Sequence, residues 1–293
     1  ISDEEDLKAI LRAPFSGVKM NGIVEHDALI HQPTANYVNY YGMANGLPLD
    51  DPDSGFDPSH PFKNRDPRFY HDIVFDGFQY INTTIAKDDD DYQFKYIQMY
   101  TGSNLRSSAS QGCRTGYYCQ KLVPHQANKY DGMYNWGGAL QCDLPYMRLA
   151  DIYLMYAEAC AATSGAQGKS SNFSKTAEAA INTIRDRCGA GHVAAEYVAN
   201  AHKFMDEVRR EREVELAFEG MRFNDLQRWL LLTEAPYNTK YEQVFERVSS
   251  DPKHPEDGQV SSYGKKVIIK RDFTAKHYWF PFPRTRGGGT SLC

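Results

Sequence analysis

Residues 207–229 read EVRREREVELAFEGMRFNDLQRW. Steps of three and four residues through this stretch place apolar and charged side chains on one helical face. The face consists of Phe204, Val208, Glu211, Glu215, Phe218, Arg222, Asp225 and Trp229. Charges on a stripe that faces the core are costly unless they are paired, so we predict an internal network of arginines and carboxylates here. The stretch is typical of a structural helix, and Gly220 is a point where that helix can break.

A helical hairpin is predicted upstream. Residues 148–165 read RLADIYLMYAEACAATSG, in which several alanines on one side allow a second helix to approach closely. Gly165 is suited to end this first helix. Ser174 can cap a second helix, TAEAAINTIRDRC, which ends at Gly189. The pair predicts a tetratricopeptide-like hairpin, which needs neighbouring helices to bury its apolar face.

The remaining segments are expected to be mostly irregular. We expect Thr34 to cap a short helix that ends near Ala44, and several short strands between Tyr70 and Tyr100. Residues 47–68, which are rich in proline, and residues 102–138, which are rich in Gly, Ser and Tyr, lack helical periodicity. The C-terminal expectations are an irregular loop over 236–263, an edge strand in KKVIIKRDF and an extended segment from His277 to Pro283.

The fold class that follows is mainly α, a tetratricopeptide-like helical scaffold with long irregular insertions and a few short strands. Residues 1–143 form a loop-rich and aromatic-rich segment, and residues 144–235 form the helical block. Residues 236–293 form an irregular segment that packs back on the core, so that the whole chain makes one domain. A hydrophobic fraction of 41% is enough for a substantial core.

Composition excludes several classes of function. The net charge of −5 argues against an electrostatic footprint for nucleic acid. No apolar run is long enough for a transmembrane helix. The six cysteines lack the spacing of a zinc site. Cys160 and Cys188 are expected to be free thiols on inner helix faces, whereas Cys113 and Cys119 can pair in an oxidising compartment or remain free.

Aromatic residues supply the main functional signal. Tyr and Trp combine a flat face, which can stack on a sugar ring, with a hydrogen-bonding group for the sugar hydroxyls. We therefore name a candidate ligand-binding set in the loop-rich part, Tyr117, Tyr118, Tyr130, Tyr134 and Trp136. The alternative is that these rings pack the loop onto the helices, because tyrosine is commonly half-buried.

Catalytic and metal sites are not predicted. The acidic runs at Asp50–Asp57 and Asp88–Asp91 lack the spacing of a calcium loop and are expected to be solvated turns. Glycoside hydrolysis needs a carboxylic acid with a raised pKa. The candidates Glu211, Glu213, Glu215 and Glu219 lie among arginines, which lower the pKa of a carboxyl group. Motifs for a serine nucleophile, a zinc protease and a phosphate loop are absent from the sequence, so we expect a protein without a cofactor that is not an enzyme.

The ordered segments RLADIYLMYAEA, AINTIRDRCGAG and RREREVELAFEGMRFNDLQRW resemble the C-terminal half of the SusD/RagB family. The resemblance extends upstream through Pro33–Ile73 and downstream through HYWFPFP at His277–Pro283. Members of that family are usually longer, with an N-terminal helical half that begins at a lipidated cysteine, whereas this sequence opens at Ile1. The chain also departs from the family in its last ten residues, RTRGGGTSLC.

This resemblance implies a lipoprotein exposed at the surface of the outer membrane of Bacteroidetes-type bacteria. Such a protein captures a glycan, or sometimes another nutrient, without cleaving it. It passes the ligand to a SusC-like TonB-dependent transporter on which it sits as a lid. Two alternatives remain at this point, a protein-interaction scaffold without its own sugar site and a glycoside hydrolase.

Overall fold

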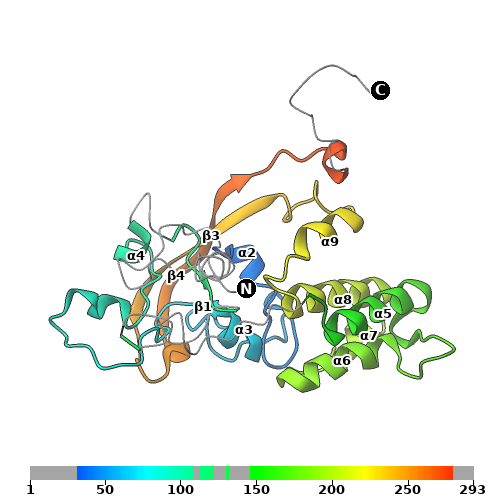
Figure 1. Cartoon of the computed structure of the whole chain (residues 1–293), viewed down its shortest axis with the longest axis horizontal. Coiled ribbons are helices and arrows are strands. Elements are labelled where there is room, and N and C mark those ends of the chain that lie inside the picture. Colours follow the sequence, from blue (N-terminus) through cyan, green and yellow to red (C-terminus); the bar gives the residue numbers. More distant parts are fainter. Residues whose placement is uncertain (1–31, 108–112, 122–129, 132–145, 280–293) are drawn as a thin grey trace, which may run out of the picture.

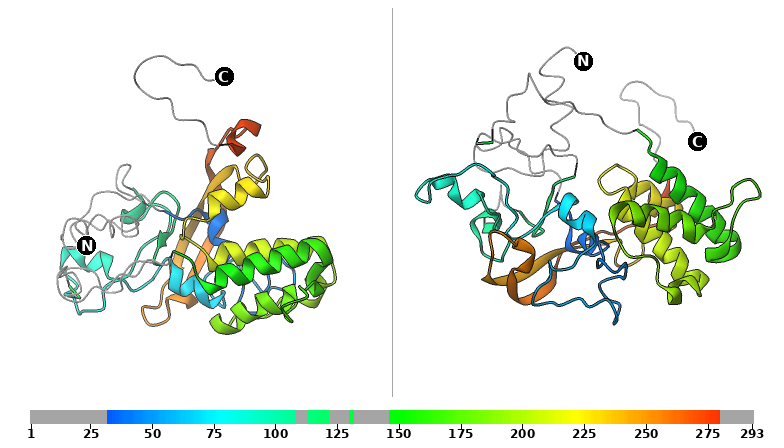
Figure 2. Two further views of the ribbon diagram at one scale, coloured as in Figure 1. Left: turned by 45° about the vertical axis from the view of Figure 1, so that its right-hand side comes forward. Right: turned by 90° about the horizontal axis from the view of Figure 1, so that it is seen from below.

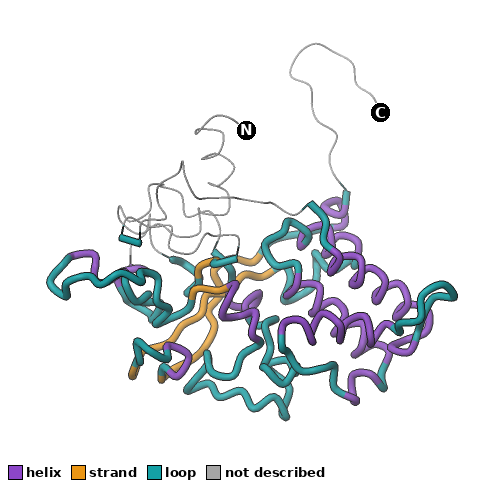
Figure 3. Tube along the Cα trace, turned by 60° about the horizontal axis from the view of Figure 1, so that its bottom comes forward, coloured by secondary structure: helices purple, strands orange, loops and turns teal. Residues whose placement is uncertain are grey.

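A computed structural model describes residues 32–107, 113–121, 130–131 and 146–279 (Figure 1). A helical lobe occupies one end of the molecule, and a lobe of loops around a long β-hairpin occupies the other. Two further views show the helices stacked beside the hairpin rather than across its faces (Figure 2). The tube coloured by secondary structure shows the same division, with helices gathered on one side (Figure 3). The mainly α fold class is confirmed, with one long hairpin in addition to the short strands.

The helical lobe contains the predicted hairpin. Its helices are α5 (Leu149–Ser164), α6 (Ala177–Cys188), α7 (Ala195–Val198) and α8 (Ala201–Glu215). Helix α5 packs against both α6 and α8, which bury its small-residue side. Gly165 ends α5, and Gly189 ends α6 in a left-handed conformation, as expected. The cap of α6 is Thr176 and not Ser174, since the Thr176 hydroxyl accepts a hydrogen bond from the Ala179 N–H over 3.1 Å.

Helices α2 (Ala35–Val38) and α8 end earlier than the sequence predicts. The four-residue helix α2 follows Thr34 but stops well before Ala44, so the expected length was wrong. Helix α8 ends at Glu215, ahead of Gly220, because Phe218 takes a left-handed backbone with φ 63°. Helix α9 (Arg222–Arg228) then starts a separate register. None of the helices in the described ranges combines the length and apolar character needed to cross a membrane.

The predicted ionic network is confirmed. Helix α8 has nine buried residues, of which six are charged. Glu211, only 1% exposed, accepts from Arg68 over 2.5 Å and from Arg185 over 2.8 Å. Arg212 contacts Asp225 over 2.8 Å and so ties α8 to α9. These charges hold helices together, because removing one partner would leave another buried charge unpaired.

The loop-rich lobe has its own aromatic core. The short elements around it are α3 (Pro67–Asp72), β1 (Ile73–Val74), the 3₁₀ helix η1 (Asp90–Phe94), α4 (Asn104–Ser107) and β2 (Tyr118–Cys119). Strands β1 and β2 pair antiparallel, with Ile73 opposite Cys119. Phe62 stacks on Phe69, with ring centroids 6.4 Å apart. The same core includes Phe245 from a later segment, so residues far apart in the chain share one interior.

A long antiparallel hairpin, β3 (Thr239–Ser249) and β4 (Gln259–Lys270), corrects the expectation of an irregular loop over 236–263. Its turn residues Pro, Gly and Asp lie mostly in the connection that contains η3 (Pro255–Asp257). The charged side chains of β3 made the strand hard to recognise in the sequence, because the face of a strand that is exposed to solvent is polar. The expected edge strand in KKVIIK is confirmed as part of β4.

Two further expectations concern the segment from His277 and the state of the cysteines. The segment from His277 was expected to be extended, but His277 and Tyr278 end a 3₁₀ helix, η4 (Ala275–Tyr278). The rest of that segment, from Phe280 onward, lies outside the described residues. Cys113, Cys119, Cys160 and Cys188 are all free thiols.

Candidate ligand-binding site

The first two candidate ligand residues lie in the core. Tyr117 and Tyr118 are both 0% exposed, because Tyr118 is on β2 and pairs with β1. The Tyr117 hydroxyl lies 3.4 Å from the hydroxyl of Tyr263 on β4. Burial raises the pKa of Tyr117 and of Tyr118. Neither ring has a free face on which a sugar could stack.

The other three candidates lie in or near ranges that are not described. Tyr130 is half-buried, and its carbonyl accepts from the Thr83 hydroxyl over 3.1 Å. Asp131 accepts backbone N–H groups from the same turn, including that of Thr83 over 2.6 Å. Tyr134 and Trp136 lie outside the described residues, so their role stays a prediction.

A concave site of about 720 Å³, called here the tyrosine pocket, lies where α2, α8 and the start of the hairpin meet. This size is within the range of ligand-binding sites. Its aromatic lining is formed by Tyr40, Tyr197, Tyr237 and Tyr241, and its polar lining includes Asn36, Asn39, Arg209 and Lys265. The four tyrosines are half-buried, so each ring keeps some exposed surface.

Arg222 contacts two of these rings through its guanidinium group. Its guanidinium lies 5.1 Å from the ring centroid of Tyr40 and 5.4 Å from that of Tyr237. It donates to the Tyr40 hydroxyl over 3.2 Å and pairs with Glu213. Burial raises the pKa of Tyr40 to about 12, so this hydroxyl stays neutral. The arginine therefore fixes two phenol rings at the wall of the pocket.

A third ring is fixed from the helical lobe. The Tyr197 hydroxyl donates to Asp51 over 2.5 Å, and Lys203 lies 5.3 Å from its ring centroid. This contact ties α7 to the turn that follows α2. The walls of the tyrosine pocket are thus held by contacts between different elements, not by a single loop.

Two amides line the same pocket. Asn36 donates to the Thr239 carbonyl over 3.2 Å and accepts the Tyr241 N–H over 3.3 Å, which joins α2 to β3. Asn39 is best placed with its oxygen toward Lys265, whose Nζ then donates over 2.7 Å. Amide and ammonium groups of this kind are suited to hydrogen bonding with hydroxyl-rich ligands.

A second concave region, the proline pocket, has a volume of about 780 Å³. It is lined by three prolines from two segments, by Tyr70, Phe75 and Phe78, and by several charged residues. Phe75 is 2% exposed, and the Tyr70 hydroxyl is already bonded to the Phe62 carbonyl over 2.6 Å. The aromatic surface offered to a ligand is therefore smaller here than in the tyrosine pocket.

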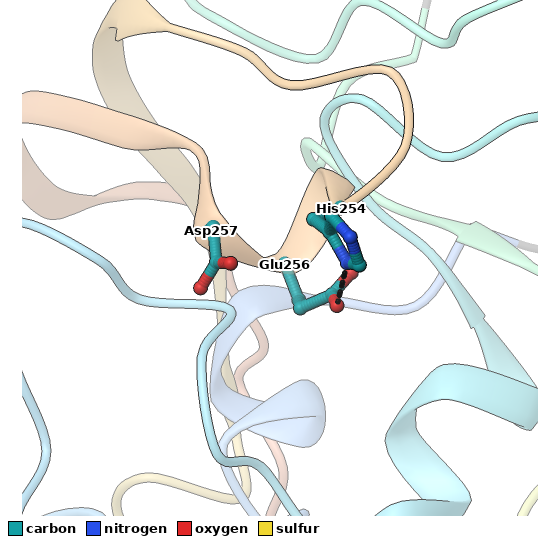
Figure 4. Close-up of side chains that lie close together, drawn as sticks. All are labelled: His254, Glu256 and Asp257. Carbon is teal, nitrogen blue, oxygen red and sulfur yellow. Dashed lines mark hydrogen bonds and ion pairs between the residues drawn. The ribbon is translucent and has the colours of Figure 1, made fainter.

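His254, Glu256 and Asp257 place possible metal-binding atoms within 4.8 Å of one another, and the two carboxylates line the proline pocket (Figure 4). His254 contacts Glu256 over 3.4 Å, and Asp257 pairs with Lys63 over 2.8 Å. Both carboxylates therefore already have a partner within the protein.

The carboxylates considered for hydrolysis are all paired. Arg68 and Arg185 lower the pKa of Glu211 to about 2, against the cost of burial. Arg148 and Lys121 likewise lower the pKa of Glu219. A general acid for glycoside hydrolysis needs the opposite shift. These groups are suited to hold the helices together.

Sequence reasoning missed the tyrosine pocket because its rings come from distant parts of the chain. Tyr40 and Tyr241 are about 200 residues apart in the sequence, and they line one pocket because α2 packs against β3. A search for local aromatic clusters favours residues such as Tyr117 and Tyr118, which are close in sequence. The available signal was the tyrosine within the strand-like sequence TKYEQVF.

Comparisons with known proteins give a consistent result. The sequence model described as the SusD family matches residues 26–286. A SusD-like protein from Bacteroides fragilis is 26% identical, with a TM-score of 0.59, over 84% of this chain and 43% of that one. A SusD-like carbohydrate-binding protein from the same organism is 22% identical, with a TM-score of 0.52, over 85% of this chain and 45% of that one.

The chain therefore spans less than half the length of these solved structures. A search of curated proteins found no match. The second structure, at 22% identity, supports the fold alone.

Proposed function

The chain belongs to the SusD family, and on that premise we propose that it binds an oligosaccharide without cleaving it. The observation that carries this proposal is the tyrosine pocket, in which four half-buried phenol rings and two amides line one concave surface. Sugars present apolar C–H faces and a rim of hydroxyls, and this lining matches both. Tyr237 and Tyr241 are the rings that we assign to stacking.

The wider role proposed is capture at the bacterial cell surface. The ligand would then pass to a SusC-like TonB-dependent transporter in the outer membrane, with a lipid anchor that lies outside this chain. Family membership supports this role. The helical lobe supplies a rigid frame, since its charges are paired internally and its helices are tied to the walls of the pocket.

The loop candidates Tyr130, Tyr134 and Trp136 remain a second proposed location for ligand contact. Asp131 fixes the adjoining turn through the Asn82 and Thr83 N–H groups, which favours a structural role for this part of the segment. The tyrosine pocket is the preferred site because its geometry is complete in the described residues.

The test is isothermal titration calorimetry of the full chain against a panel of oligosaccharides, with a reducing-end assay on the same samples. Heat of binding without new reducing ends supports capture. Tyr237→Ala should weaken the affinity about tenfold, which corresponds to about 1.4 kcal/mol and is a typical loss for one stacked ring. Tyr70→Ala, in the proline pocket, is the matched control and should leave the affinity unchanged.

Other outcomes would support the alternatives. Release of reducing ends would favour a glycoside hydrolase. Binding of a transporter with no affinity for any sugar would favour a protein-interaction scaffold.

A further inference from the structure

Two arginine–carboxylate ion pairs lie in and beside the wall of the tyrosine pocket. Arg210 contacts Glu207 over 2.6 Å, and Arg222 pairs with Glu213. All four side chains are therefore neutralised within the protein. Other cations, in and beside the pocket, are not neutralised in this way.

Lys240 on β3 is the first of these cations. It lies next to Tyr237, whose carbonyl accepts from Lys240 Nζ over 3.5 Å. Burial and the positive charges of Arg222 and Arg271 lower the pKa of Lys240, whose side chain is half-buried. A half-buried cation that has no counter-charge among the described residues is costly, so this position favours the arrival of an anion.

Lys265 and Arg209 are the other two. Lys265 donates to the amide of Asn39, and the acid that acts on it, Asp50, is exposed and therefore screened by water. Arg209 has a buried Nε without an acceptor in the described part of the chain, and its Nη1 reaches the exposed Asp206 only at 3.5 Å. Both side chains line the tyrosine pocket.

We propose that the tyrosine pocket takes an anionic sugar, one that carries a carboxylate or a sulfate group. The anion would lie toward Lys265 and Lys240, where it would gain charge-assisted hydrogen bonds. The apolar face of the ring would lie against Tyr237 or Tyr241. This inference rests on the proposed function, because it names the class of sugar that the same pocket binds.

Matched ligands distinguish a preference for anionic sugars from the binding of sugars in general. The full chain is titrated with oligogalacturonate, with its methyl ester and with a sulfated galactan oligosaccharide. The ester keeps the sugar and its linkage but removes the charge. A panel of neutral oligosaccharides is titrated in parallel. We expect the acid or the sulfated sugar to bind at least tenfold more tightly than the ester and the neutral panel.

Matched variants test where the anionic group binds. Lys240→Met and Lys265→Met keep side-chain length and remove charge, and each should weaken binding of the anionic sugar about tenfold. Binding of the ester should weaken much less than binding of the acid in both variants. Lys253→Met, at the rim of the proline pocket, is the control and should have no effect. Melting temperatures of all variants show whether the fold is kept.

Each possible result supports or overturns the proposal of an anionic sugar. Tighter binding of the carboxylate sugar or of the sulfated sugar identifies which anion the pocket prefers, and supports the inference. Equal affinity for acid and ester, or preference for neutral sugars, overturns the inference while the proposed function stands. Anion binding that persists in the Lys240→Met/Lys265→Met double variant overturns the location. Failure of every sugar to bind overturns both proposals.

Discussion

Glu211 illustrates how single residues set the stability of this fold. It is buried on α8 between Arg68 and Arg185, and its pKa lies near 2 in place of 4.5. Replacing it by Gln keeps the shape but leaves two buried guanidinium groups short of a counter-charge. We expect Glu211→Gln to lower the free energy of unfolding by about 3–5 kcal/mol, measured by urea denaturation. Glu196→Gln, at an exposed pair with Lys203, should cost less than about 1 kcal/mol.

Glu211 should also make the free energy of unfolding depend on pH in the acid range. A carboxyl group with a lowered folded pKa stabilises the fold above its unfolded pKa, and that stabilisation is lost as pH falls. For Glu211 the window runs from about 4.5 down to about 2. Its shift corresponds to roughly 3 kcal/mol at neutral pH. Unfolding experiments should therefore show a loss of stability across this window that is much smaller in Glu211→Gln. An unchanged pH profile in that variant would contradict this assignment.

Lys240 should make ligand binding depend on pH. Burial, together with the positive charges of Arg222 from α9 and Arg271 after β4, lowers the pKa of Lys240 to about 8. A bound anion would raise that pKa, so binding takes up a proton once the free lysine is neutral. Affinity for an anionic sugar should be constant below pH 8 and fall as pH rises above it. Calorimetry from pH 6.5 to 9.5 measures this, and Lys240→Met should remove the slope.

At the scale of elements, the end of α6 is joined to the turn after α2 by a close backbone contact. The Gly191 N–H donates to the Ala44 carbonyl over 2.8 Å. A Cβ on Gly191 would lie 2.1 Å from the Asn45 carbonyl oxygen, so no side chain fits there. This contact holds the turn that carries Pro48 and Leu49 into the wall of the tyrosine pocket.

Gly191→Ala should therefore disturb both stability and binding. We expect a loss of more than about 2 kcal/mol in the free energy of unfolding, because the overlap is with backbone that cannot move independently. Sugar affinity should fall as well, since the pocket wall shifts. Gly189→Ala is the comparison, because its Cβ meets open space and only the left-handed backbone costs about 1 kcal/mol. Equal effects of the two substitutions would argue against a steric junction.

Elements differ in how well the sequence predicts them. Helices α5 and α6 followed from periodicity and from Gly165 and Gly189, because those signals are local. The charged face of α8 also led to its ion pairs, since a buried charge requires a partner. The hairpin β3–β4 could not be predicted this way. Its alternation is interrupted by register shifts, and its apolar residues such as Phe245 join a core supplied by residues 62–75.

At the scale of the whole molecule, the tyrosine pocket exists only because two lobes meet. Its lining comes from α2, α8 and the hairpin, which the sequence separates by most of its length. Pairing between distant segments sets such a site, so a linear pattern of aromatic residues cannot locate it. This explains why Tyr117 and Tyr118, adjacent in sequence and rich in aromatic character, lie in the core.

The central claim is that the tyrosine pocket binds sugar. The most direct measurement is calorimetric titration of one oligosaccharide that binds the full chain into Tyr237→Ala and Trp136→Ala variants side by side. We predict a loss of about tenfold or more in Tyr237→Ala and an unchanged affinity in Trp136→Ala. The reverse result, with affinity lost only in Trp136→Ala, would contradict the claim and place the sugar in the loop segment.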